Sequence, residues 1–300
     1  MKNLKDKVAF VTGGASGIGF GIVKAFLEEG MRVMVADLRV DHLDEAREAL
    51  GPRDDVDFVR VDVIDRGAME RAARDVISRF GACHILVNNA GVGTVPRVED
   101  MRYEDWDWVM SVNLGGTVNG LMAFLPHILR QGEGGHVVST ASMAGLLPTV
   151  DNFIYAASKY AIRGLSDSLR LSLASRKVGV SVLYPGLTRS RMLQSEKNRQ
   201  ARFGDAADNT PPPGPVVPPA DAGMDPYEVG RAVVAGIRAN RGYILSHAEF
   251  RDELAAHFDE ILSCFPADQE IDPGRLMLED MRRKQTEAAH RALAAMTDVI

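Results

Sequence analysis

Short apolar runs alternate with longer amphipathic stretches along most of the chain. The runs are rich in β-branched residues and end in glycine, asparagine or aspartate, as do strands buried on both faces of a parallel sheet. The amphipathic stretches have the spacing of helices that cover such a sheet. Strands are predicted at residues 8–11, 32–36, 59–63, 85–87, 137–140, 180–184 and 243–245. The pattern predicts an α/β fold in which one Rossmann-type domain contains a doubly wound, seven-stranded parallel sheet.

Two segments depart from this alternation. A long helix predicted over residues 104–130 is interrupted at Gly115 and Gly116, and it carries Asn113 among apolar positions, where an amide needs hydrogen-bond partners. Residues 191–225 are first polar and then rich in proline, which excludes the interior of a strand or helix. We expect a loop or lid there rather than a further part of the sheet.

Past the last predicted strand, the chain continues as two helices. The second is strongly charged and begins at Asp272-Pro273. The first carries its apolar residues on one side, namely Phe250, Leu254, Phe258, Ile261 and Leu262. We therefore divide the chain into a domain over residues 1–250, which includes the 191–225 segment, and a helical extension over residues 251–300.

Composition narrows the class of protein. The net charge of −6 argues against a nucleic-acid surface, which needs clustered lysine and arginine. The start of the chain has no apolar signal region, and no apolar run approaches the ~20 residues that cross a bilayer. The two cysteines, Cys83 and Cys264, lack the spacing of metal ligands, so we expect reduced thiols, no metal site and a cytoplasmic location.

A glycine-rich turn joins the first predicted strand to the helix that follows it. Its glycines, Gly13, Gly17 and Gly19, have the spacing G-x3-G-x-G. Residues without side chains let the backbone approach a pyrophosphate, whose charge is stabilised at the helix N-terminus. The strand, the turn and the helix together predict a dinucleotide site.

The second predicted strand ends at Asp37, about 20 residues beyond the turn. A carboxylate at this place accepts hydrogen bonds from the adenosine ribose hydroxyls and repels a 2′-phosphate, so Asp37 favours NAD over NADP. Arg39 leaves the alternative open, because a nearby arginine can accommodate that phosphate.

Tyr155 and Lys159 are four residues apart in a helix-compatible stretch, and Ser142 precedes them. Positions i and i+4 share one face of a helix, so the phenol and the ammonium can meet. Lowering the pKa of a tyrosine by ~3 needs ~4 kcal/mol, about what one cation supplies at ~4 Å in an effective dielectric of ~20. Lys159 can therefore convert Tyr155 into a usable acid and base.

These motifs resemble the short-chain dehydrogenase/reductase family. The turn has the family's TGxxxGxG form, residues 88–91 read NNAG, and Tyr155-x3-Lys159 follows Ser142. The resemblance covers about residues 5–250 and implies the strand order 3-2-1-4-5-6-7. It also implies that residues 191–225 lie beside the active site as a substrate lid.

The resemblance assigns four catalytic roles. Tyr155 would take the hydroxyl proton during oxidation, and Ser142 would hydrogen-bond the substrate oxygen. Lys159 would also bind the nicotinamide ribose, and Asn113 would complete a proton relay. Thr188 stands where valine is commoner in the family. The implied cofactor contacts are Gly13, Ser16, Gly17, Ile18, Gly19, Asp37, Leu38, Asp62, Val63, Asn89, Ala90, Gly91, Tyr155, Lys159, Pro185, Gly186 and Thr188.

The expected activity is reversible hydride transfer between NAD and a secondary alcohol or ketone. Two alternatives stay open, namely an NADPH-dependent carbonyl reductase and a dinucleotide-binding sensor without turnover. Residues 243–261 are similar to bacterial dehydrogenases that oxidise the benzylic Cα alcohol of lignin-derived aryl ethers, which implies a bulky, aromatic alcohol as substrate. No nucleic-acid or membrane partner is expected.

We also expect a homodimer or homotetramer. The helices over 104–130 and 153–175 carry more apolar positions than one sheet face can cover, and a two-fold partner would bury the excess. These positions are Val109, Val112, Leu121, Phe124, Leu125, Ile162, Leu165, Leu169 and Leu173.

Overall fold

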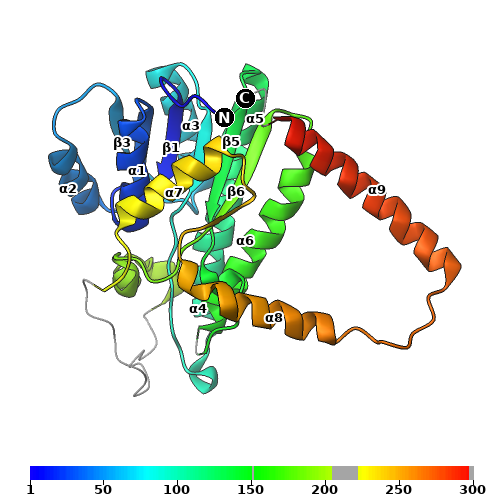
Figure 1. Ribbon diagram of the computed structural model, residues 1–300. Coiled ribbons are helices and arrows are strands. Elements are labelled where there is room, and N and C mark those ends of the chain that lie inside the picture. The colour runs from blue at the N-terminus through cyan, green and yellow to red at the C-terminus, as the bar shows by residue number, and fades with distance from the viewer. Residues whose placement is uncertain (151, 205–221, 297–300) are drawn as a thin grey trace.

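The computed structural model describes residues 1–150, 152–204 and 222–296, and Figure 1 shows one sheet flanked by helices on both faces. The seven strands pair in parallel in the order β3-β2-β1-β4-β5-β6-β7, which confirms the predicted sheet and its strand order. The strands are β1 Val8–Thr12, β2 Arg32–Asp37, β3 Val56–Arg60, β4 Ile85–Asn88, β5 Gly135–Thr140, β6 Val178–Tyr184 and β7 Tyr243–Leu245.

Each face of the sheet has its own layer of helices and its own apolar core. One face is covered by α1 Gly17–Glu28, α2 Val40–Leu50 and α7 Pro226–Arg238. The other is covered by α3 Arg66–Phe80, α4 Tyr103–Met110, α5 Gly116–Gln131 and α6 Phe153–Ser172. This arrangement explains why the strands are apolar on both faces.

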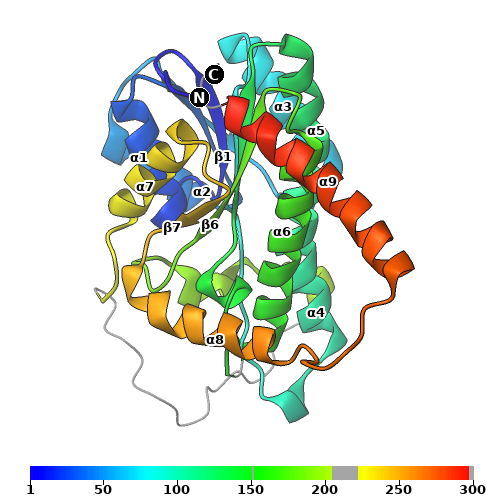
Figure 2. The same cartoon turned by 45° about the vertical axis from the view of Figure 1, so that its right-hand side comes forward.

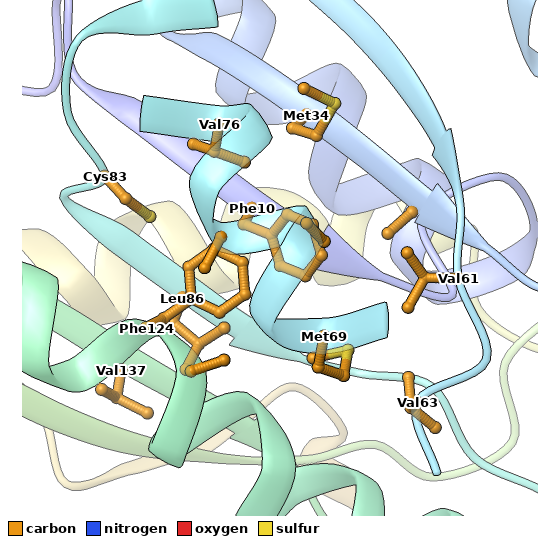
Figure 3. Close-up of a cluster of buried hydrophobic side chains, with 14 of the residues drawn as sticks. Phe10, Met34, Val61, Val63, Met69, Val76, Cys83, Leu86, Phe124 and Val137 are labelled. Carbon is orange, nitrogen blue, oxygen red and sulfur yellow. The ribbon is translucent and has the colours of Figure 1, made fainter. Parts of the chain in front are cut away.

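Figure 3 shows the core on the second of these faces. Phe10 of β1 stacks on Phe124 of α5 with the ring centroids 4.2 Å apart. Met69 and Val76 of α3 pack beside them, and all four side chains are fully buried. Because each such side chain contributes about 1.5–3 kcal/mol on burial, this cluster fixes α3 and α5 against the sheet.

The third strand does not lie where the sequence pattern puts it. It covers Val56–Arg60 instead of 59–63, and Asp62 and Val63 follow its end. Asp62 Oδ1 accepts a hydrogen bond from the Ile64 N–H at 3.2 Å, which turns the chain out of the sheet. The prediction followed the alternation of apolar and polar residues, which continues past this turn.

The long helix is interrupted as predicted, by a wider π-helical turn over Ser111–Gly115 that contains Asn113. A window within the helical stretch Tyr103–Gln131 has a mean hydropathy of 1.2, which by length and composition alone would be enough to cross a membrane. However, 56% of that window is buried in the fold, as in the core helix of a globular domain.

The apolar excess predicted on these helices is largely covered within the chain itself. Val109 and Phe124 are fully buried, and Ile162 is 1% exposed. The argument therefore fails for these three side chains, whereas Leu121, Leu125, Leu165 and Leu169 are half-buried. It overlooked the contacts that α4, α5 and α6 make with one another and with α3.

Both predicted helices of the extension form. After β7 the chain continues as α8 Arg251–Ser263 and α9 Pro273–Met296. Phe250 and Leu254 pack against a buried apolar cluster that includes Met143, Leu146 and Tyr184, which connects the start of the extension to the rest of the fold. The proline-rich part of the predicted lid, residues 205–221, lies outside the described residues.

Candidate functional site

A cleft lies at the carboxyl ends of the strands, next to the point between β1 and β4 where the strand order reverses. Open α/β sheets bind their ligands at such a point. The predicted residues that line the cleft are Gly13, Ser16, Gly17, Ile18, Asp37, Leu38, Asp62, Val63, Asn89, Ala90, Gly91, Tyr155, Lys159 and Pro185. Gly19, Gly186, Thr188, Asn113 and Ser142 lie behind or beside this lining.

The glycine turn forms one wall of the cleft. Gly13 has φ +59°, and a Cβ there would lie 3.0 Å from the Ala90 Cα. A Cβ on Gly19 would lie 2.0 Å from the Gly13 carbonyl oxygen. Gly19 is therefore required for close packing inside the turn, and its neighbours in the turn line the cleft.

The end of β4 is held against this turn by side-chain hydrogen bonds. Thr12 Oγ1 accepts from the Asn89 N–H at 2.9 Å and from the Ala90 N–H at 3.0 Å. The Asn89 amide donates to the Thr12 and Gly13 carbonyl oxygens at 3.1 and 3.3 Å. Asn89 thus fixes the shape of the wall, and little of its hydrogen-bonding capacity remains for a ligand.

Asp37 lies at the far end of the cleft and is 9% exposed. Its Oδ1 accepts from the Arg39 N–H at 3.1 Å, and its Oδ2 accepts a longer bond from the Ala15 N–H at 3.4 Å. Burial raises the pKa of this carboxyl, and these backbone hydrogen bonds together with the charge of His42 only partly oppose the shift. The carboxylate retains lone pairs for hydroxyl donors.

Arg39 faces its neighbour Asp41 instead of the cleft. The Arg39 Nε donates to Asp41 Oδ1 at 2.9 Å, and the two groups form an ion pair. His42 was missed by the sequence analysis, although it lines the cleft with its Nδ1 3.8 Å from Asp37 Oδ1. Burial lowers the pKa of His42.

At the other end of the cleft, α6 brings Tyr155 and Lys159 together, and Ser142 follows the end of β5. Burial raises the pKa of Tyr155, and a hydrogen bond from Ser142 opposes the increase. Lys159 is 2% exposed, and its Nζ lies 5.2 Å from the centre of the Tyr155 ring and donates to the Thr140 carbonyl oxygen at 2.9 Å. Burial lowers the pKa of Lys159 to about 7.

These shifts differ from the simple expectation for the pair. The sequence argument counted the attraction between an ammonium and a phenolate, but it left out the cost of removing both groups from water. In the structure this cost raises the pKa of the tyrosine and lowers that of the lysine. The two pKa values therefore move apart: the tyrosine holds its proton more tightly than a free phenol, and the lysine releases its proton more readily than a free ammonium.

Asn113 is fully buried in the π-helical turn. Its Oδ1 accepts from the Val92 N–H at 2.8 Å, and its Nδ2 donates to the Val92 carbonyl oxygen at 3.0 Å and to Ser158 Oγ at 2.9 Å. The Asn113 side chain thus connects the loop after β4 to α6, one residue from Lys159. This arrangement accounts for an amide among apolar positions.

The start of the segment that the family resemblance places beside the active site lies at the cleft, which residues 190–192, 195, 198 and 200 line. Ser195 Oγ donates to the Gly93 carbonyl oxygen at 2.8 Å, and the Gln200 amide donates to Asp62 Oδ2 at 3.0 Å. Arg199 fixes this segment to α4 through a buried ion pair with Asp105, 2.8 Å long. These contacts join residues about a hundred positions apart, so no local pattern indicates them.

His247 is a second residue that the sequence analysis missed. It is 5% exposed and lies beyond β7. Its Nδ1 accepts from the Gly186 N–H at 3.0 Å, so the proton is on Nε2, which donates to the Leu187 carbonyl oxygen at 3.1 Å. His247 therefore holds the turn after β6, behind Pro185 of the cleft lining.

The residues present fit a dinucleotide. The glycine turn lines one wall with residues that have no side chain, and the cleft extends from a buried carboxylate to a tyrosine and lysine pair. A carboxylate suits the two hydroxyls of a ribose, and the backbone N–H groups at the start of α1 suit a pyrophosphate.

Comparison with known proteins agrees with this geometry. Residues 7–201 match the family model described as short chain dehydrogenase. The C alpha-dehydrogenase of Sphingobium sp. strain SYK-6 is 34% identical over 277 residues, which are 91% of this chain and 90% of that protein.

Two solved structures have the same fold over nearly the whole chain. One, from Novosphingobium aromaticivorans and described as a short-chain dehydrogenase, has a TM-score of 0.83 and 38% identity and covers 98% of this chain and 100% of its own. A short chain dehydrogenase/reductase from Burkholderia phymatum in complex with NAD has a TM-score of 0.79 and 29% identity and covers 91% and 100%. The motifs, the fold and these matches together establish that the chain belongs to the short-chain dehydrogenase family and is an oxidoreductase.

Proposed function

We propose that the protein catalyses reversible hydride transfer between NAD and a secondary alcohol or its ketone. The observation that carries the proposal is the placement of Ser142, Tyr155 and Lys159 at one end of a cleft that has Asp37 at the other. When bound, the nicotinamide ring accepts or donates the hydride. The protein supplies orientation, charge stabilisation and proton transfer.

In the oxidation direction, Tyr155 takes the proton of the substrate hydroxyl, and Ser142 hydrogen-bonds the same oxygen as charge develops on it. The hydrogen bond between Ser142 and Tyr155 brings both hydroxyls within reach of one substrate oxygen. Lys159, with its pKa near 7, passes the proton on and holds the nicotinamide ribose. Asn113 fixes the loop and the helix that carry these groups.

The test of this mechanism is the Tyr155→Phe variant. Phenylalanine keeps the packing volume and removes the proton-transfer group, so we expect kcat to fall by at least a thousandfold while NAD affinity stays within about twofold. Stopped-flow measurement of NADH formation and a fluorescence titration of NADH measure the two quantities. Retention of most of the kcat in Tyr155→Phe would refute the assignment.

The proposed preference for NAD over NADP rests on the Asp37 carboxylate and on the ion pair that Arg39 forms with Asp41. Repulsion between the Asp37 carboxylate and a 2′-phosphate at ~5 Å is worth ~3 kcal/mol per unit charge at a dielectric of ~20, about a hundredfold in affinity. Arg39, the cation that might oppose this, is ion-paired with Asp41. The Burkholderia phymatum relative was solved with NAD, which agrees with this preference.

One observation favours the alternative, an NADPH-dependent reductase. Arg191 lines the cleft and pairs with Glu45 of α2 at 2.5 Å, so a second guanidinium lies near the Asp37 end. Titration of wild type, Asp37→Ala and Arg191→Ala with NADH and NADPH separates the two proposals. We expect Asp37→Ala to narrow the preference for NADH. Tighter binding of NADPH than NADH by wild type, lost in Arg191→Ala, would establish the alternative.

For the substrate we propose a bulky, aromatic secondary alcohol. An apolar cluster adjoins Ser142, and the start of the extension closes it. The Sphingobium relative is named a C alpha-dehydrogenase, which agrees with the resemblance of residues 243–261 to dehydrogenases of benzylic Cα alcohols. The members of the cluster are Ala141, Met143, Leu146, Leu147, Ile162, Val182, Tyr184, Phe250 and Leu254.

We further propose a cytoplasmic homodimer or homotetramer, in which residues 1–250 form the catalytic domain and residues 251–300 form the extension. Both cysteines, the buried Cys83 and the exposed Cys264, are free thiols, as a reducing compartment favours.

A further inference from the structure

Two side chains at the cleft contain a buried hydrogen-bond acceptor that is not used. Within the described part of the chain, Asn198 Oδ1 and Gln200 Oε1 have no hydrogen-bond partner, and both residues line the cleft. Buried polar atoms in folded proteins are nearly always hydrogen-bonded, so an exception at a cleft needs an explanation, such as contact with a ligand. Gln200 is the more informative of the two, because its amide nitrogen is already bonded to another residue of the cleft.

The Gln200 side chain lies at the end of the cleft that contains Asp37. Its Nε2 donates to Asp62 Oδ2 at 3.0 Å. Asp62 is next to Val61 in the chain, and the Val61 N–H donates to the Asp37 carbonyl oxygen at 2.9 Å. The base of a nucleotide is attached to the ribose carbon that adjoins the 2′-hydroxyl. A ribose held by the Asp37 carboxylate therefore brings its base to the part of the cleft where Asp62 and Gln200 meet.

This part of the cleft has apolar walls. Leu38, Val61 and Val63 line it, and Val61 and Val63 are only 4% and 8% exposed. In a ligand site, apolar walls hold the bulk of the ligand, and a few polar groups fix its orientation. Walls of this kind suit the two faces of a planar base, and Asp62 and Gln200 supply polar groups for its edge.

These two polar groups offer an excess of acceptors. Asp62 Oδ1 accepts from the Ile64 N–H at 3.2 Å and Oδ2 accepts from Gln200, which leaves lone pairs on both oxygens. Because a carboxylate only accepts hydrogen bonds, the Gln200 nitrogen faces Asp62, and Oε1 is the atom without a partner among the described residues. An amino group carries two N–H donors and can satisfy two such acceptors, whereas a carbonyl would meet them with its own lone pairs.

We propose that Gln200 acts with Asp62 to recognise the 6-amino group of the adenine base, so that Gln200 determines specificity for the base. Asp62 supplies the charged acceptor. Gln200 holds this carboxylate in place through Nε2 and supplies the second acceptor through Oε1. The inference rests on the proposed binding of NAD, and it adds to the nucleotide site a residue 138 positions beyond Asp62.

The segment that carries Gln200 is held in place by other contacts. Ser195 Oγ accepts from the Gly93 N–H at 3.2 Å and donates to the Gly93 carbonyl oxygen at 2.8 Å. Arg199 forms its ion pair with Asp105 of α4, and Figure 2 shows α4 beside α6. A substitution of Gln200 should therefore leave the segment where it is and alter only the contact with the base.

The test compares NAD with nicotinamide hypoxanthine dinucleotide, in which a carbonyl replaces the 6-amino group. Isothermal titration calorimetry on the full chain gives the ratio of the two dissociation constants. We expect wild type to bind NAD at least tenfold more tightly than the analogue, and Gln200→Leu to reduce this ratio to about threefold or less. Gln194→Leu makes the same change at an exposed position of the same segment and should keep the wild-type ratio.

The ratio separates recognition of the base from a loss of structure, because a displaced segment would weaken the binding of both dinucleotides by the same factor. The inference is overturned if wild type binds the two dinucleotides equally, or if Gln200→Leu keeps the wild-type ratio. In either case, NAD binding and turnover by wild type would leave the hydride-transfer proposal intact. Absence of NAD binding by wild type would overturn both.

Discussion

Replacing Lys159 by methionine should make the protein more stable while it abolishes activity. The Lys159 side chain is 2% exposed, and burial lowers its pKa from 10.5 to about 7. A difference of this size corresponds to a cost on the order of 4 kcal/mol for folding with a charged lysine. The variant also loses the hydrogen bond to the Thr140 carbonyl oxygen, worth about 1 kcal/mol, so a net gain of about 3 kcal/mol is expected near pH 6.

The sign of the pH dependence follows from proton binding. Between pH 7 and 10.5 the unfolded chain binds a proton at Lys159 that the folded chain has released, so the stability of wild type rises with pH in this window. The advantage of Lys159→Met is therefore full below pH 7, falls through the window and vanishes above it.

Urea unfolding of wild type and Lys159→Met at pH 6, 8 and 9.5 measures this difference. The exposed Lys5 provides a matched control, because Lys5→Met removes a charge without removing a buried one. A gap in unfolding free energy that is absent, or that stays constant with pH, would refute the account of a desolvated lysine.

Two further changes test contacts outside the expected motifs. His247→Ala should raise the KM for NAD about tenfold with little change in kcat or in its pH profile, because the turn after β6 loses two hydrogen bonds of about 1 kcal/mol each. His247→Asn keeps an acceptor for the Gly186 N–H and should recover part of the lost affinity. Equal kinetics of wild type, His247→Ala and His247→Asn would contradict a positioning role for His247. Arg199→Met leaves the buried Asp105 carboxylate with Arg102 at 3.5 Å as its remaining ion-pair partner, a loss of about 1.5–3 kcal/mol that should release residues 192–203 and speed tryptic cleavage at Lys197 and Arg202. An unchanged cleavage rate would show that the ion pair of Arg199 with Asp105 does not hold the segment.

Local patterns in the sequence predicted the parts of the fold that local chemistry determines. Apolar runs between amphipathic stretches predicted seven parallel strands, and the glycine turn after β1 lies at the cleft as expected. Tyr155 and Lys159 meet because both belong to α6, at a spacing that the helix itself fixes. The end of β3 was misplaced because the alternation of residue types extends beyond the hydrogen-bonded pairs.

Contacts between distant parts of the chain could not be predicted in this way. The ion pair of Arg199 with Asp105 and the hydrogen bonds of His247 to the turn after β6 depend on how the whole chain is folded. The same holds for burial. Val109 and Phe124 look like surplus apolar positions on a single helix, yet neighbouring helices cover them. Ile261 and Leu262 look like part of an ordinary buried amphipathic face, yet both are exposed.

Burial also gives the cleft a property that no motif describes. At one end the pKa of Asp37 is raised, and at the other the pKa of Lys159 is lowered, so folding disfavours the charged form of both groups. Hydrogen bonds from hydroxyls to the carboxylate, and from the ammonium to hydroxyls, favour the charged forms. A ligand that carries a ribose at each end would therefore recover at both sites part of the free energy that folding loses there. Because free energy is recovered at both ends of the cleft, a dinucleotide should bind more tightly than either of its nucleotides alone. The gain in binding also explains why buried groups that lower the stability of the fold are retained in this cleft.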